Sequence, residues 1–142
     1  MKATDWDSIR HFKASENWGD VSKINFQLVK TLDLFRDYIA TPIQITCGTQ
    51  GKHIENSMHY LGKAVDVVFP SIKKADLFDL FLCALRFSFG GVGIYPDWHP
   101  MGGLHLDVRD APFKAQWIGY NNGSGQIYLP MTKDNLKKSN CV

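Results

Sequence analysis

Apolar residues recur at three- and four-residue spacing in two stretches of the chain, and this spacing is typical of amphipathic helices. The first stretch predicts a helix over residues 20–39, with Asp20 as its N-cap and Thr41-Pro42 at its end. Its apolar face consists of Ile24, Leu28, Leu32, Phe35 and Ile39. Residues 1–19 carry Trp6, Phe12 and Trp18 among polar residues, so we expect an irregular arm that lies on the core.

The second helical stretch follows Pro70. We expect this helix to begin after Ser71, its N-cap, and to be stopped by Gly90-Gly91. The predicted apolar face consists of Leu77, Phe78, Phe81, Leu82 and Leu85.

Between and after these helices, short stretches alternate apolar and polar residues or are rich in β-branched residues, as strands are. Five strands are predicted, over residues 43–46, 64–69, 91–95, 104–109 and 126–129, before an irregular tail that starts at Lys133. The separation of helices from a run of short strands indicates an α+β fold, with a small, mainly antiparallel sheet and helices packed on one face. We expect one domain over residues 1–142, with its core over about residues 10–120.

The composition is that of a globular protein and narrows the function only a little. A net charge of +2 gives no indication of nucleic-acid binding. Cys47, Cys83 and Cys141 are widely spaced and lack a CxxC pattern, so they predict free thiols in a reducing compartment. The N-terminus has no apolar run that would form a signal peptide, and no stretch is apolar enough to span a membrane. We therefore expect synthesis in the cytoplasm and a monomer.

The candidate chemistry lies where polar residues interrupt the predicted strands. Asp66 stands between two valines, and an unpaired buried carboxylate is costly, so this side chain requires a cation or several donors. His105 and Asp107 are two residues apart and therefore share one face of their strand. His59 lies above Asp66 only if the chain turns before Gly62.

Two interpretations of these residues remain open. Two imidazoles and a carboxylate suit a zinc ion that keeps one position for water, although manganese and iron also accept such ligands. A zinc-bound water ionises near neutral pH, as amide hydrolysis requires. The other interpretation is a half-solvated sheet with a buried salt bridge, for example between Asp66 and Arg109.

The motifs Ser57-x-His59-x-x-Gly62-x-Ala64-x-Asp66 and His105-x-Asp107-x-Arg109 resemble those of the zinc peptidases of family M15. This family includes D-alanyl-D-alanine carboxypeptidases, dipeptidases and phage endolysins, and it shares its fold with the hedgehog signalling domain. Further similarity lies in Phe12-x-x-x-Glu16, in residues 42–46 and in residues 91–95. The resemblance implies that His59, Asp66 and His105 are zinc ligands, and that Ser57 and Gly62 shape the ligand loop.

Two positions depart from the family pattern. Gln50 stands where many members have an arginine that polarises the scissile carbonyl, and a neutral amide offers less charge to an oxyanion. Gly102 stands where members often place a carboxylate base. His99 is then a candidate base, with a solvated loop histidine as the alternative. Asp107 is a further candidate, which we expect only to orient the site or to bind Arg109.

The resemblance implies a zinc metallopeptidase that cleaves peptidoglycan stem peptides as a carboxypeptidase or endopeptidase, with Gln50 and Trp98 in contact with the substrate. Tyr95, Trp98, Trp117 and Tyr120 are candidate groove walls, with the hydrophobic core as the alternative. Such a chain fits a phage lysin that reaches the cell wall through the lysis machinery or on the phage particle. The alternative function is a non-catalytic, zinc-containing binding module. We expect no partnership with nucleic acid or membranes.

Overall fold

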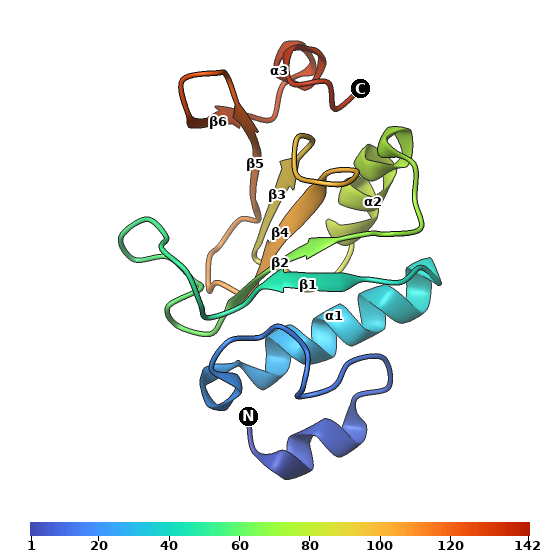
Figure 1. Ribbon diagram of the computed structural model, residues 1–142, viewed down its shortest axis with the longest axis vertical. Coiled ribbons are helices and arrows are strands. Elements are labelled where there is room, and N and C mark those ends of the chain that lie inside the picture. Colours follow the sequence, from blue (N-terminus) through green and yellow to red (C-terminus); the bar gives the residue numbers. More distant parts are fainter.

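A six-stranded mixed sheet forms the centre of the protein (Figure 1), in a computed structural model that describes residues 1–142 apart from the side chain of Ala3. The strand order is β1-β2-β4-β3-β5-β6, and every pairing is antiparallel except that of β3 with β5. The strands are β1 (Gln44–Cys47), β2 (Ala64–Val68), β3 (Gly91–Tyr95), β4 (Gly103–Asp107), β5 (Ala115–Asn121) and β6 (Gln126–Pro130). The predicted α+β class is confirmed.

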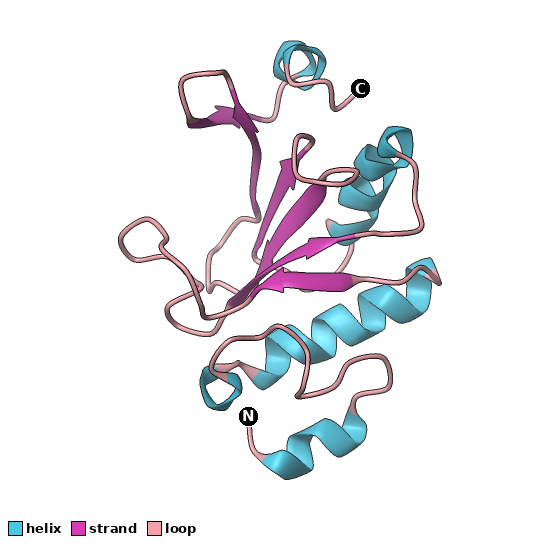
Figure 2. Cartoon of the chain, in the orientation of Figure 1, coloured by secondary structure: helices cyan, strands magenta, loops and turns pink.

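Three α-helices accompany the sheet (Figure 2): α1 (Phe26–Ile39), α2 (Leu77–Ala84) and α3 (Lys133–Lys138). Asp20 does not cap α1, because its carboxylate accepts from Ser22 in a separate 3-10 turn, Val21–Lys23. Asn25 caps α1 instead, accepting from two backbone N–H groups of the first turn. The prediction of a single helix over residues 20–39 was therefore too long at its start.

The second predicted helix also begins later than expected. A 3-10 turn, Lys74–Asp76, precedes α2, so the proposed N-cap at Ser71 was wrong. The predicted tail contains α3, which Thr132 caps by accepting from the backbone N–H of Asn135. Strand β5 was missed entirely. None of the helices in the described chain is long and apolar enough to cross a membrane.

One face of the sheet carries the hydrophobic core. Helices α1 and α2 pack there against alternate residues of the strands, including Val65, Val67, Leu104 and Leu106. Because side chains alternate along a strand, the intervening residues of β2 and β4 lie on the opposite face. The arm predicted for residues 1–19 joins the core, since Trp18 is fully buried, and it also contains a 3-10 helix, Ala3–Ser8. The sheet thus separates packing on one face from polar residues on the other.

Phe35 on α1 is the aromatic centre of this core and supplies a test of it. Its ring lies edge-on to Phe69, Phe87 and Phe89, at centroid distances of 6.5, 5.3 and 6.0 Å. We expect Phe35→Ala to lower the free energy of unfolding by about 3–5 kcal/mol, because it removes buried apolar contacts and leaves a cavity. Leu34→Ala is the control, since Leu34 is 48% exposed on the same helix and its loss should cost far less. Denaturant titration measures both, and equal losses would contradict this assignment of the core.

Candidate metal centre

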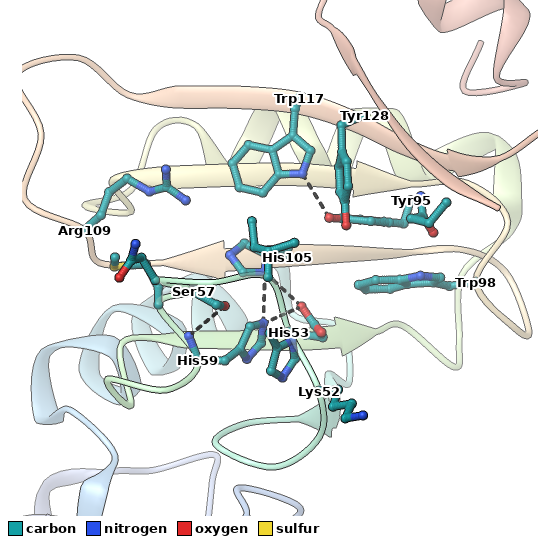
Figure 3. Close-up of a pocket in the computed structure, with 15 residues that line it drawn as sticks. Lys52, His53, Ser57, His59, Tyr95, Trp98, His105, Arg109, Trp117 and Tyr128 are labelled. Atoms are coloured by element: carbon teal, nitrogen blue, oxygen red, sulfur yellow. Dashed lines mark hydrogen bonds and ion pairs between the residues drawn. The ribbon is translucent and has the colours of Figure 1, made fainter.

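The polar residues of the strands meet in one row that crosses the sheet. Asp66 of β2 pairs in register with His105 of β4, which pairs with Gly93 of β3, and Gly93 pairs with Trp117 of β5. Figure 3 shows the side chains of His105 and Trp117 on the face of the sheet that lies away from the helices. Residues more than fifty positions apart in the chain are therefore brought to one site by strand register alone.

His59 reaches this row from a loop, through the turn that the sequence predicts before Gly62. The backbone N–H of Gly62 donates to the carbonyl of His59 (3.0 Å), and the hydroxyl of Ser57 accepts from the N–H of His59 (3.3 Å). Gly62 has a φ of +66°, and a Cβ there would collide with the carbonyl of Lys23. Its own carbonyl accepts from the N–H of Asn25 (2.9 Å), which fixes the turn to the start of α1. The predicted turn is confirmed.

Each imidazole has one nitrogen directed at a fixed acceptor outside the site. Nδ1 of His59 lies 2.7 Å from the carbonyl oxygen of Gly48, and Nε2 of His105 lies 3.0 Å from Oδ2 of Asp107. Neither acceptor carries a proton to give, so these ring nitrogens are the donors. Nε2 of His59 and Nδ1 of His105 are then left with lone pairs that face Asp66.

The three inward-facing atoms form a nearly equilateral triangle. Nδ1 of His105 lies 3.0 Å from Oδ1 of Asp66, Nε2 of His59 lies 3.3 Å from that oxygen, and the two nitrogens are 3.2 Å apart. Two ligands of a tetrahedral zinc ion with ordinary bond lengths are about 3.4 Å apart. The triangle therefore fits one face of a zinc tetrahedron within a few tenths of an ångström, and the fourth position is left for water or substrate.

The electrostatics of the site are those of a cation-binding pocket. Burial disfavours the charged form of His59, but hydrogen bonding to Asp66 outweighs this and raises the pKa of His59 to about 9. Burial alone would raise the pKa of Asp66, whereas its hydrogen bonds with His105 and His59 lower it to about 2. The pKa of His105 is also raised, because hydrogen bonds to Asp107 and Asp66 outweigh burial. A positive charge among these three groups is thus strongly favoured, and a divalent cation would compete with the proton for that place.

Behind His105, a buried ion pair supports the site. The Asp107 side chain is fully buried, and Arg109 binds it through Nη2 (2.6 Å) and Nε (2.9 Å). These bonds and the one to His105 outweigh burial and lower the pKa of Asp107 well below its usual range. A Cβ on Gly91 of β3 would collide with the Asp107 carboxylate, so the pair needs a glycine there. The alternative pairing of Asp66 with Arg109 was wrong, because Arg109 binds Asp107 instead.

A cavity of about 720 Å³ opens above the three candidate ligands. Four aromatic residues line it: Tyr95, Trp98, Trp117 and Tyr128. Tyr95 and Trp98 stack at a centroid distance of 4.0 Å, and the indole of Trp117 donates to the hydroxyl of Tyr95 (3.0 Å). Trp117 lies across Gly93, where any Cβ would stand 2.5 Å from the indole ring. The aromatic residues therefore form a wall of the cavity.

The other predicted site residues are placed differently. Trp98 lines the cavity, as predicted for substrate contact, but Gln50 does not: its amide donates to Asn17 and accepts from the N–H of Gly48. His99 is exposed and lines a smaller hollow beside Asp66 and Trp98. Asp107 lies behind His105, where it can orient that ring.

Sequence reasoning did not identify some of the lining. Of the candidate groove walls, Tyr120 does not line the cavity, because it is three residues from Trp117 and so points to the other face of β5. Tyr128 of β6 lines the cavity instead. His53 also lines the cavity, with its ring stacked on that of His59 at a centroid distance of 4.0 Å. Tyr128 could have been found only by knowing how β6 pairs with β5.

A second group of possible metal ligands shares His59. It consists of Cys47, His53 and His59, each of which offers one ligand atom within 4.8 Å of the others. Here both the thiol of Cys47 (3.1 Å) and Nε2 of His53 (2.8 Å) already lie within hydrogen-bond distance of the carbonyl of Gln50. The group with Asp66 and His105 is the better metal site, because its inward-facing atoms contact one another and no backbone carbonyl.

Comparison with known proteins adds no assignment: no protein-family model matches the chain, and no curated protein matches it.

We expect His59→Ala, Asp66→Ala and His105→Ala each to abolish binding of one zinc ion per chain, because two ligands rarely hold zinc in a protein. His11→Ala is the matched control, since His11 pairs with Asp37 elsewhere and its loss should leave zinc binding intact. Elemental analysis after dialysis against zinc measures the content. Zinc retained by all three variants would contradict this centre.

Asp107→Asn tests the support behind His105. The amide removes the charge that orients the imidazole and pairs with Arg109, so we expect zinc affinity to fall about 10- to 100-fold. Asp110→Asn is the control, because Asp110 is exposed in the same segment. Competition with a chromophoric chelator measures the affinity. Equal affinities for the two variants would show that Asp107 does not support the metal site.

Proposed function

We propose that this protein is a zinc-dependent peptidase that hydrolyses peptide bonds of peptidoglycan stem peptides, with the hedgehog-type zinc fold of the M15 peptidases. The observation that carries the proposal is the triangle of His59, Asp66 and His105 at the floor of an open cavity. A structural zinc site is closed by four protein ligands, whereas a catalytic site has three and keeps one position free. Zinc held there would polarise a carbonyl group and activate water.

The residues of the chain have separate tasks in this proposal. Gly48 and Asp107 hold the two imidazoles in the orientation in which their lone pairs face Asp66. The aromatic wall excludes water from one side of the cavity and positions the peptide. His99 is the candidate base, since it is exposed beside the hollow that Asp66 and Trp98 also line. Asp107 is a positioning residue, because it is fully buried and bound to both His105 and Arg109.

A zinc-containing binding module is the second candidate function, and one observation favours it. Asp66 is the only carboxylate among the described residues that line the cavity, and it is needed as a ligand. The position where family members carry an arginine is Gln50, whose amide is engaged by Asn17 and Gly48. A module that binds stem peptides without cleaving them would need neither group.

Incubation of the zinc-loaded protein with purified peptidoglycan distinguishes the two functions. We expect new amino termini to appear with wild type and none with His105→Ala, which lacks a metal ligand. His99→Ala should keep its zinc and lose about 10²- to 10⁴-fold in kcat if His99 is the base. Zinc bound to wild type without any cleavage, but with retention of peptidoglycan in a pull-down, would favour the binding module.

A further inference from the structure

Arg109 presents a hydrogen-bonding edge to the cavity that the protein itself does not use. Its Nε and Nη2 bind Asp107, whereas Nη1 forms no hydrogen bond among the described residues. The side chain lines the cavity and is 33% exposed (Figure 3). Its guanidinium also lies 5.4 Å from the ring centre of Trp117. The buried carboxylate therefore holds Arg109 in a fixed position with one nitrogen free.

The charges around the cavity favour an anionic ligand. Lys52 and Arg109 are its cationic lining residues, and Asp66 is the acidic residue among those described. Once Asp66 is used as a metal ligand, no carboxylate of the lining opposes an incoming anion. Guanidinium groups bind carboxylates with charge-assisted hydrogen bonds, and a preorganised guanidinium loses little conformational entropy when it does so.

We propose that Nη1 of Arg109 binds a free carboxylate of the ligand in this cavity. This inference deepens the proposed function and rests on it for the identity of the ligand as a peptide. Only the Asp107 carboxylate and the His105 imidazole separate Arg109 from the metal-facing nitrogen. Nη2 of Arg109 lies 2.6 Å from Oδ2 of Asp107, and the same oxygen lies 3.0 Å from Nε2 of His105. A ligand carboxylate at Arg109 would therefore lie on the side of the cavity where His105 is held.

A pair of small thiols tests the subsite without any cleavage. The thiol of 3-mercaptopropanoate binds zinc while its carboxylate is free to reach Arg109, and 3-mercaptopropanamide differs only in lacking the charge. Titration calorimetry on the zinc-loaded protein gives the ratio of the two affinities. We expect wild type to prefer the acid by about 10- to 100-fold, the range for a hydrogen bond between charged groups.

Two variants and one control complete the test. Arg109→Gln removes the free nitrogen and its charge, and we expect it to abolish the acid preference, so that the acid and the amide bind with equal affinity. Arg109→Lys should reduce the preference and serves if the glutamine variant does not fold, because its ammonium can still pair with buried Asp107. Lys52→Gln removes the other cation of the lining and leaves the guanidinium in place, so it should lower the preference far less than Arg109→Gln does. Zinc content is checked in each protein.

The outcomes separate this inference from the proposed function. Equal affinities of wild type for acid and amide, no binding of either thiol, or a preference that survives in Arg109→Gln would overturn the carboxylate subsite. Loss of the acid preference in Lys52→Gln would also overturn the subsite, because the preference would then come from the overall positive charge of the cavity and not from Nη1 of Arg109. An acid preference that depends on Arg109, in a protein that cleaves no peptidoglycan, would support the subsite and remove the peptidase.

Discussion

Three electron-pair donors converge on one point in this protein, and this arrangement requires a cation. Nε2 of His59, Nδ1 of His105 and Oδ1 of Asp66 lie within 3.3 Å of one another, and lone pairs so close together repel unless a positive charge lies among them. The carbonyl of Gly48 and the carboxylate of Asp107 accept the one proton of each neutral imidazole, so the remaining lone pairs face Asp66. Because the pKa of His59 is raised to about 9, a proton supplies the positive charge among these groups until a metal ion displaces it.

The support for this point continues outward through the sheet. His105 is held by Asp107, Asp107 by Arg109, and the pair fits only because Gly91 on the neighbouring strand has no side chain. Gly93, on the same strand, leaves room for Trp117. At these two positions β3 has no side chain, so large side chains of the neighbouring strands can cross it. On its other face, β3 carries Val92 and Ile94 into the core. Packing and chemistry are separated by the alternation of side chains.

The two candidate functions share the metal centre and differ in what the remainder of the cavity does. An open face on the metal triangle and an aromatic wall suit a peptide that lies against the sheet. In the proposed peptidase, the scarcity of acidic groups in the lining leaves a histidine as the candidate for proton transfer. His99 is exposed, and none of the described residues hydrogen-bonds to its side chain, so its imidazole can approach a ligand but has no fixed orientation.

The sequence by itself determined the features that depend on neighbouring residues. Periodicity located α1 and the strands β2 and β4, and the two-residue spacing of His105 and Asp107 put them on one face. Gly62 predicted the turn that brings His59 over Asp66, because a left-handed turn is easiest for glycine. Tertiary structure alone decided the place of Trp117 across Gly93 and the place of Tyr128 in the wall. These follow from strand order and register, including the parallel pairing of β3 with β5, which joins segments far apart in the chain. Local sequence patterns do not indicate such strand pairing. The pairing depends on which hydrophobic faces bury one another when the whole sheet assembles.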